Sequence, residues 1–314
     1  RVVTPDVAQA QYDCRRKEDD QSRIHDTGKG GAGKTTVTAS LAKVWPREAI
    51  VVDADVEAPN VALFTDTTIE SKTPVAMRVP EKITDRCDFC GECIAICQFK
   101  AVVKLGDRIV AFPDMCHGCG GCFTVCTRNA IKEGERALGE IVQGKAFDGQ
   151  HSFLAGRSRI GESMTPPLIR ALNQRLKTMG DNRDVLIDAP PGVSCPVMTA
   201  SRMADLVVLI AEPTPFGFHD FRLAVQAFKE SDKPMAVILN RSGQANTQAI
   251  ESEIAHFCET EKLWLIDAIP FAEEAAKHYA RSGLLCDLNE QWHERFVEIA
   301  RRLCALDAKE DTYA

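Results

Sequence analysis

Two short runs of cysteine are the residues of this sequence best suited to metal chemistry. Eight of the 13 cysteines lie between Cys87 and Cys126, and both runs have the spacing C-x2-C-x2-C-x3-C. Three thiolates spaced in this way on a tight loop can bind three irons of a cubane cluster. Structural zinc sites instead use two separated C-x2-C pairs. The spacing therefore favours two [4Fe-4S] clusters over two zinc ions.

Each run resembles one half of a bacterial two-cluster ferredoxin, and the duplication extends beyond the thiols, because Ala101-Val102 parallels Ala130-Ile131. In that family the fourth cysteine of each run binds the other cluster. The resemblance implies one cluster bound by Cys87, Cys90, Cys93 and Cys126, and a second bound by Cys116, Cys119, Cys122 and Cys97. Gln98 and Thr127 replace the usual proline after the fourth cysteine, which removes no ligand. His117 is interpreted as a polar loop residue, because four thiolates already complete its site.

A second chemical motif precedes the cysteines. Residues 28 to 36 read Gly-Lys-Gly-Gly-Ala-Gly-Lys-Thr-Thr and fit the phosphate loop G-x4-G-K-[ST]. The amides of such a loop bind phosphate oxygens at a helix N-terminus, Lys34 neutralises the outer phosphates, and the Thr35 hydroxyl reaches Mg²⁺. The predicted nucleotide-binding residues of the loop are Gly28, Gly30, Gly31, Ala32, Gly33, Lys34, Thr35 and Thr36.

Lys29 gives the loop the form K-G-G-x-G-K-T. This form resembles the deviant Walker A loop of the MinD/ParA/Mrp superfamily of P-loop ATPases, which includes the nitrogenase iron protein. In that superfamily the signature lysine crosses a dimer interface to the phosphates of the partner subunit. The resemblance implies a homodimer that binds ATP and Mg²⁺ at its interface, with Lys29 and Lys34 among the catalytic residues.

Two acidic segments resemble the switches of the same superfamily. Asp53 and Asp55 end an apolar strand and resemble switch I, where a carboxylate orients the attacking water or the metal shell. The sequence leaves open which of the two does so. Residues 185–192 resemble the Walker B strand and switch II, which implies that Asp188 lies near Mg²⁺, directly or through water, and Gly192 near the γ-phosphate.

Two further residues follow strands at the positions that the superfamily uses for the base. Asn240 matches its base-reading asparagine, and Pro270 matches a segment that packs on adenine. Cys195 follows switch II, and we interpret it as a structural residue in a packed turn.

Short apolar runs alternate with helical patterns along the remaining chain. The predicted strands are 49–52, 185–187, 206–210, 236–239 and 263–269, and the predicted helices include 166–177, 218–230 and 248–258. Apolar strands of this kind are typical of a parallel sheet covered by helices on both faces. The sequence thus predicts an α/β, doubly wound, mostly parallel sheet of the P-loop NTPase (SIMIBI) type, with an inserted small α+β bacterial-ferredoxin-like domain.

The domain boundaries follow from the position of the cysteine runs. We expect residues 1–78 and 134–314 to form one ATPase domain, interrupted by a two-cluster domain at 79–133. Residues 141–162 are expected to form a connecting hairpin that returns to the sheet. Residues 21–27, before the phosphate loop, contain a single aliphatic side chain, Ile24, and are left open as either an unusual first strand or an atypical start.

Composition excludes several classes of protein. The chain has 314 residues, 45% of them hydrophobic, and a formal net charge of -7. The acidic balance argues against nucleic-acid and anionic-membrane binding. Without a segment of about 20 apolar residues or a signal-peptide pattern, the expectation is a cytoplasmic protein with no membrane insertion. Trp292, Phe296, Ile299 and Leu303 recur at helical spacing near the end of the chain and predict a core-packing helix.

Together these motifs predict an ATPase that couples binding and hydrolysis of MgATP to electron transfer through two [4Fe-4S] clusters to an unidentified acceptor protein. One alternative is an iron-sulfur carrier or assembly scaffold of the Mrp type, which would require a C-terminal C-x2-C pair, whereas Cys258, Cys286 and Cys304 are isolated. The other is a positioning switch of the ParA or MinD kind.

Overall fold

A nine-stranded sheet organises the protein, in the order β11-β10-β9-β1-β8-β2-β7-β6-β3. The computed structural model describes residues 23–28, 31–179 and 183–307. The strands are β1 (Arg23–Gly28), β2 (Ala49–Asp53), β3 (Thr68–Ile83), β4 (Val102–Leu105), β5 (Arg108–Ala111), β6 (Ile131–Ala146), β7 (His151–Ser158), β8 (Asp184–Asp188), β9 (Leu206–Ala211), β10 (Met235–Ser242) and β11 (Trp264–Pro270). From β11 to β7 neighbouring strands are parallel, and β6 and β3 continue the sheet antiparallel.

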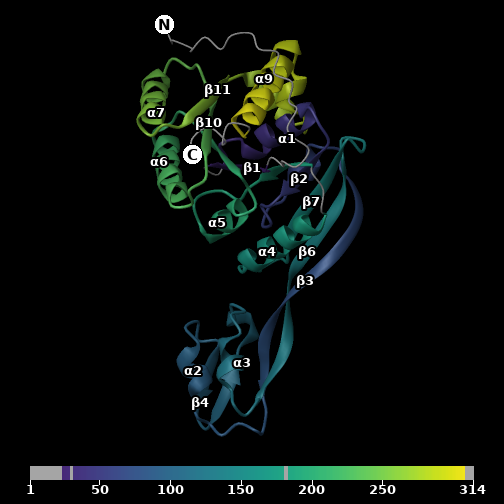
Figure 1. The fold of residues 1–314 in the computed structure, drawn as a ribbon, viewed down its shortest axis with the longest axis vertical. Helices are drawn as coiled ribbons and strands as arrows, with labels where there is room; N and C mark the ends of the chain where they lie inside the picture. The colour runs from purple at the N-terminus through teal and green to yellow at the C-terminus, as the bar shows by residue number, and fades with distance from the viewer. Residues whose placement is uncertain (1–22, 29–30, 180–182, 308–314) are drawn as a thin grey trace.

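Helices cover both faces of the sheet, as predicted for a doubly wound fold (Figure 1). The α-helices are α1 (Lys34–Val44), α2 (Glu92–Ile96), α3 (Gly121–Val125), α4 (Thr165–Thr178), α5 (Cys195–Ser201), α6 (Pro215–Lys229), α7 (Gln248–Thr260), α8 (Glu273–Tyr279) and α9 (Glu290–Asp307), with 3-10 turns η1 (Val61–Leu63), η2 (Pro113–Met115) and η3 (Leu285–Asp287). Helices α1 and α9 pack on one face, and α4, α5, α6 and α7 on the other. Every residue of β2, β8 and β9 is buried, which explains the apolar runs at 49–52, 185–187 and 206–211.

The segment before the phosphate loop is a regular strand at the centre of the sheet. β1 pairs in parallel with β8 on one side and with β9 on the other, from Ile24 opposite Leu206 to Gly28 opposite Ile210. Of the two possibilities left open by the sequence, the unusual first strand is therefore correct. β1 is a strand because its backbone hydrogen-bonds to β8 and to β9, and this pairing does not require a run of apolar side chains.

The expected hairpin at 141–162 is confirmed, because β6 and β7 pair antiparallel from Gly139 opposite Ser158 to Ala146 opposite His151. Its first half belongs to β6, and residues 151–158 form β7, which pairs in parallel with β2 and antiparallel with β6. Both strands are therefore part of the main sheet. The pairing of β7 with β2 joins segments that are distant in sequence, and local sequence patterns do not predict such pairing.

A long two-stranded ribbon carries the cysteine region away from the body of the sheet (Figure 1). β3 and β6 each have 16 residues and pair from Thr68 opposite Lys145 to Ile83 opposite Ile131. Val79 and Glu133 lie within these two strands. Beyond the end of the ribbon the chain forms α2, α3 and a separate two-stranded sheet of β4 and β5.

The last long helix packs in the core, as predicted. Trp292, Phe296, Ile299 and Leu303 of α9 are buried against the same cluster as α1. Among residues 23–28, 31–179 and 183–307, no helix is both long and apolar enough to span a membrane.

Candidate functional site

The phosphate loop joins the carboxyl end of β1 to the first turn of α1. Gly33 has φ +95°, a left-handed conformation that favours glycine, and α1 begins at the next residue. A Cβ on Gly33 would lie 2.4 Å from Asn240 Nδ2, and one on Gly28 would lie 2.5 Å from the Ile210 carbonyl oxygen. Glycine is thus required at position 28 by the close approach of the β9 backbone, and at position 33 by the left-handed conformation and the Asn240 side chain packed against it. The amides at the start of α1 form an anion-binding end, because they lie at a helix N-terminus. Lys29 and Gly30 lie outside the described residues.

The helix start is joined to the Walker B strand by a hydrogen bond between side chains. Thr35 Oγ1 donates to Asp188 Oδ2 over 2.7 Å, whereas Asp188 Oδ1 is buried without a hydrogen-bond partner. Burial raises the pKa of Asp188 to about 7, against the opposing effects of the Thr35 hydrogen bond and the Lys34 charge. An orphaned carboxylate oxygen beside a threonine hydroxyl is a donor set that suits Mg²⁺.

The structure separates the two aspartates that the sequence left as alternatives. Asp55 lines the cavity beside the phosphate loop. Asp53 is fully buried and accepts hydrogen bonds from the backbone amides of Asp55 (3.2 Å) and Val61 (3.0 Å). Burial raises the pKa of both carboxyls, and the nearby Asp188 raises that of Asp53 further. Asp53 therefore fixes the backbone of the segment that follows β2. Asp55 is the carboxylate that can contact a ligand in the cavity.

A cavity of about 460 Å³ opens beside the phosphate loop at the carboxyl ends of the parallel strands. The predicted residues on its wall are Gly31, Gly33, Lys34, Thr35, Thr36, Asp55, Asn240 and Pro270. Residues that the motifs did not assign to the site are Asn60, Pro191, Arg241, Ile269, Phe271, Ala272, Ala275, Ala276, Tyr279, Leu285 and Trp292. Most of the latter come from α8, α9 and their flanking loops. These segments carry no local motif and reach the cavity only through packing.

Asn240 lines the cavity, but both ends of its amide have protein partners. Its Nδ2 donates to the Ala32 carbonyl oxygen over 2.7 Å, and its Oδ1 accepts from the Arg241 amide over 3.0 Å. In this arrangement Asn240 holds the phosphate loop against β10. Gly192, with φ +85°, donates from its amide to the Gly28 carbonyl oxygen and thereby links switch II to the same loop.

The cysteine region repeats its backbone as well as its sequence. Residues 29 positions apart, as Cys87 and Cys116 are (116 − 87 = 29), share a left-handed conformation: Phe89 with Gly118, Gly91 with Gly120, and Lys100 with Asn129. The sulfur contacts repeat too, because the Ala101 amide donates to Cys97 Sγ (3.3 Å) and the Ala130 amide to Cys126 Sγ (3.2 Å).

The cysteine region contains two small cavities, each lined by four thiols. One cavity, the distal site, is lined by Cys87, Cys90, Cys93 and Cys126; the other, the proximal site, is lined by Cys97, Cys116, Cys119 and Cys122. Cys116 of the proximal site belongs to a cluster with Met77 and Leu138 of the ribbon, and Met164, before α4, packs against this cluster. His117 stacks on Phe99 over this site, with ring centroids 3.5 Å apart.

Comparison with protein-family models identifies the family of the chain. Residues 27–285 match the model of the CobQ/CobB/MinD/ParA nucleotide binding domain, which covers most of the chain. The chain belongs to this MinD/ParA family. Its members are P-loop ATPases.

Relatives of this MinD/ParA-family chain occur in Methanocaldococcus jannaschii. The uncharacterized protein MJ0578 is 31% identical over 279 residues, covering 88% of this chain and 94% of that protein. The uncharacterized protein MJ0579 is 28% identical over 220 residues, covering 69% of this chain and 78% of that protein.

Solved MinD/ParA-type structures share the fold at low sequence identity. The septum site-determining protein MinD of Pyrococcus horikoshii, complexed with Mg-ADP, has a TM-score of 0.55 and 17% identity, covering 92% of this chain and 99% of that one. A complex of Cyanothece McdA with ATP has a TM-score of 0.55 and 16% identity, covering 92% and 98%. These likenesses support the fold alone.

One interpretation from the sequence is corrected at the edge of the MinD/ParA-type site. Cys195 is exposed at the first position of α5, not packed in a turn. The sequence Gly-Val-Ser-Cys-Pro gave no sign of this, because exposure there depends on how α5 lies against the sheet.

Proposed function

We propose that this MinD/ParA-family protein binds and hydrolyses MgATP, carries two [4Fe-4S] clusters on the module at residues 79–133, and passes electrons to a partner protein. The observation that carries the proposal is the pair of four-thiol cavities at the end of a ribbon whose strands continue the sheet of the nucleotide site. One protein thus combines a nucleotide site with two sites suited to redox centres.

The donor sets fit [4Fe-4S] clusters better than single metal ions. Within the described part of the chain, no three Cys, His, Asp or Glu side chains come together around a single metal ion. Four thiols spread around each cavity, with backbone amides donating to their sulfurs, are the arrangement used for a polynuclear cluster. When bound, such a cluster stores and passes on single electrons. The thiol sets are those implied by the resemblance to two-cluster ferredoxins.

Five residues would carry the chemistry at the nucleotide. Lys34 and the amides at the start of α1 would neutralise the phosphates, and Thr35 and Asp188 would hold Mg²⁺. Asp55, whose pKa is raised by burial, would orient the attacking water and accept its proton. Lys29 would contact the phosphates of a partner subunit.

A homodimer with nucleotide at its interface forms part of the proposal. Leu63, Val193 and Phe216 are large apolar side chains, and Leu63 and Phe216 are respectively 68% and 77% exposed. They follow the carboxyl ends of β2, β8 and β9, which is the edge that carries the nucleotide cavity. Apolar side chains exposed around such a site are what a second subunit would cover.

A positioning switch of the MinD or ParA kind is the second candidate function. The structural neighbours favour it, since they include MinD cell division proteins and a plasmid partition protein. On this alternative the nucleotide cycle would control attachment to DNA or a membrane, and the cysteine module would serve another purpose. The carrier of the Mrp type is less suited to this chain, because Cys258, Cys286 and Cys304 are buried and form no C-x2-C pair in the sequence.

Anaerobic purification followed by metal analysis and electron transfer measurements tests the main proposal. We expect about eight irons per chain, the spectrum of [4Fe-4S] clusters, and reduction of an acceptor that requires ATP hydrolysis. A chain that hydrolyses ATP but holds no iron, and that binds DNA in a salt-sensitive manner or binds anionic vesicles, would favour the positioning switch instead.

A further inference from the structure

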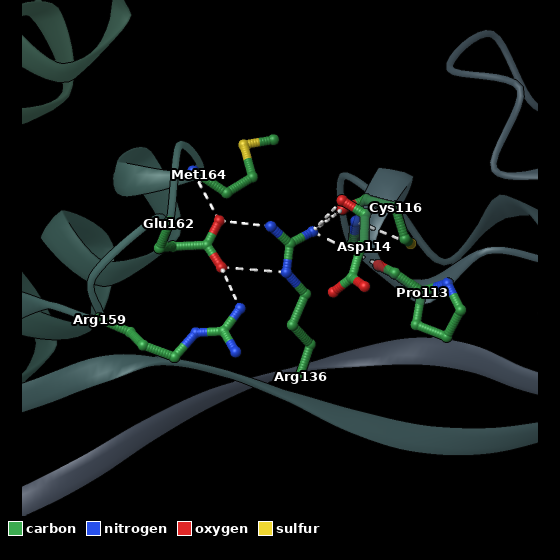
Figure 2. A network of polar contacts seen from close by, with 8 residues as sticks. Pro113, Asp114, Cys116, Arg136, Arg159, Glu162 and Met164 are labelled. Atoms are coloured by element: carbon green, nitrogen blue, oxygen red, sulfur yellow. Dashed lines mark hydrogen bonds and ion pairs between the residues drawn. The ribbon is translucent and has the colours of Figure 1, made fainter.

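A buried ion pair joins the ribbon to the loop before α4 and to the proximal cysteine loop at once (Figure 2). Arg136 of β6 donates from Nε to Glu162 Oε2 over 3.0 Å and from Nη2 to Glu162 Oε1. Its third nitrogen, Nη1, donates to the carbonyl oxygens of Asp114 (2.7 Å), Cys116 (3.2 Å) and Pro113 (3.4 Å). The Arg136 side chain is 8% exposed and that of Glu162 is 0% exposed. One guanidinium thus fixes both a carboxylate and the backbone that presents Cys116.

Glu162 is in turn tied to switch I by a short chain of backbone hydrogen bonds. The Ser158 amide at the end of β7 donates to the Val56 carbonyl oxygen over 2.7 Å, and Val56 directly follows Asp55. The Arg159 amide donates to the Leu138 carbonyl oxygen, and the Glu162 amide to that of Arg159, over 2.8 and 3.0 Å. β7 also lies close to switch I, because a Cβ on Gly156 would come within 2.5 Å of Val56 Cγ1.

The Glu162 carboxylate is held from two sides. Glu162 Oε1 also accepts from the Met164 amide over 2.8 Å, so its carboxylate is held by the start of α4 as well as by Arg136. Bidentate guanidinium pairs have fixed geometry, and buried charges cannot separate into water without a large penalty. A displacement of Val56 would therefore be passed on to the backbone of residues 113–116.

We propose that the Glu162–Arg136 pair is a relay that transmits the nucleotide state of switch I to the loop carrying Cys116, so that the proximal site responds to nucleotide and the distal site does not. The inference rests on the proposed function, because it requires nucleotide at the phosphate loop. Arg136 and Glu162 are positioning residues in this relay, since neither lines the nucleotide cavity.

The internal repeat supplies a control within the chain. Residues 84–90 correspond to 113–119 by the same offset of 29 positions and belong to the distal site. Among the described residues, Arg136 donates no hydrogen bond to residues 84–90, whereas three carbonyl oxygens of residues 113–116 accept hydrogen bonds from it. A nucleotide effect that travels through Arg136 should appear in one segment and be absent from the other.

The relay is tested by measuring amide hydrogen exchange in the iron-loaded protein. Exchange rates are compared between the protein bound to Mg-ADP and the protein bound to a non-hydrolysable Mg-ATP analogue. In the wild type we expect amide exchange in 113–119 to differ about fivefold or more between the two nucleotides, the scale of a typical allosteric coupling. Exchange in 84–90 should stay constant. Glu162→Gln keeps the shape of the side chain and an oxygen that can accept from the Met164 amide, but it removes the charge. This variant should abolish the difference in exchange between the two nucleotides.

Two further variants separate the relay from a loss of folding. Arg159→Gln removes a half-exposed partner of Glu162, 3.6 Å away, and should keep the wild-type difference. Arg136→Met combined with Glu162→Gln removes both buried charges, and should remain folded yet show no nucleotide difference. Iron content and nucleotide affinity are measured for each variant and should match the wild type.

The outcomes distinguish the relay from the proposed function. If the wild type binds both nucleotides and 113–119 exchanges equally in both, or if Glu162→Gln retains the full difference, the relay is wrong while the ATPase proposal stands. If neither nucleotide binds the wild type, the proposed function fails and the relay fails with it.

Discussion

Thr35 and Asp188, 153 positions apart in sequence, share a hydrogen bond of 2.7 Å between Thr35 Oγ1 and Asp188 Oδ2. The pairing brings the first turn of α1 and the carboxyl end of β8 together at the nucleotide cavity. Because the carboxyl of Asp188 is buried, its pKa rises to about 7 from an ordinary 3.8, and a proton competes with Mg²⁺ for it near neutral pH.

Mg²⁺ affinity should therefore depend on pH. In the nucleotide-bound protein we expect the affinity for Mg²⁺ to rise as pH increases through about 7, because Asp188 must lose its proton to bind a cation. Calorimetric titration with Mg²⁺ between pH 6 and pH 8 measures this, as does phosphate release at limiting Mg²⁺. Thr35→Ser keeps the hydroxyl and should preserve the profile. A Mg²⁺ affinity independent of pH would contradict the assignment of Asp188.

The stability of the metal-free protein should show the opposite dependence. A carboxyl whose pKa is raised by folding binds more protons in the folded state, so stability falls as pH rises between the unfolded and folded pKa values. For Asp188 this window runs from about 4 to about 7. Denaturant unfolding at several pH values should show this decline, and Asp188→Asn should reduce its slope. Asp53 contributes in the same direction, because burial and the charge of Asp188 raise its pKa too.

The two switch I aspartates should fail in different ways when replaced. Asp55→Ala removes a carboxylate from the cavity wall and should abolish hydrolysis while the melting temperature stays near that of the wild type. Asp53→Ala leaves the amides of Asp55 and Val61 unpaired in the interior, and should lower the free energy of unfolding by about 1–3 kcal/mol. Phosphate release and thermal unfolding of both variants decide the matter. Equal loss of stability in the two would argue against this division of roles.

Two glycines of the phosphate loop offer a matched test of its packing. Gly31 and Gly33 both have positive φ, +84° and +95°, so alanine at either position has a backbone penalty of about 1 kcal/mol. Only at Gly33 would the new Cβ also collide with Asn240 Nδ2, whereas nothing lies within 4 Å at Gly31. Gly33→Ala should thus weaken nucleotide binding at least tenfold more than Gly31→Ala, as measured by fluorescent nucleotide titration.

The crossed pairing of thiols can be tested one cluster at a time. Cys126→Ser should affect the distal site, although the other three thiols of that site belong to the first cysteine run. Cys97→Ser should affect the proximal site, although the other three thiols of that site belong to the second run. Each variant should fall from about eight to about four irons per chain. Cys258→Ser, at a buried thiol outside both groups, should retain all of them. Low-temperature electron paramagnetic resonance of the reduced proteins should show a different remaining signal in the two single variants.

The sequence by itself predicted the P-loop ATPase family and the buried strands. Glycine spacing, Lys34 and Thr35 predict the phosphate loop because its conformation is local, and β2, β8 and β9 were predictable because strands buried on both faces have apolar interiors. The duplicated cysteine runs likewise predict a duplicated backbone, which the matched left-handed residues confirm.

Only the tertiary structure decided the remaining features. β1 has its place through pairing with β8 and β9, and β7 through pairing with β2, so neither depends on a local apolar pattern. The division between Asp53 and Asp55 depends on burial, which two acidic residues one position apart do not reveal. Arg136 and Glu162 are ordinary charged residues in the sequence. They become a buried pair because the ribbon, the loop before α4 and the Cys116 loop meet at one point, and such long-range contacts leave no local pattern in the chain.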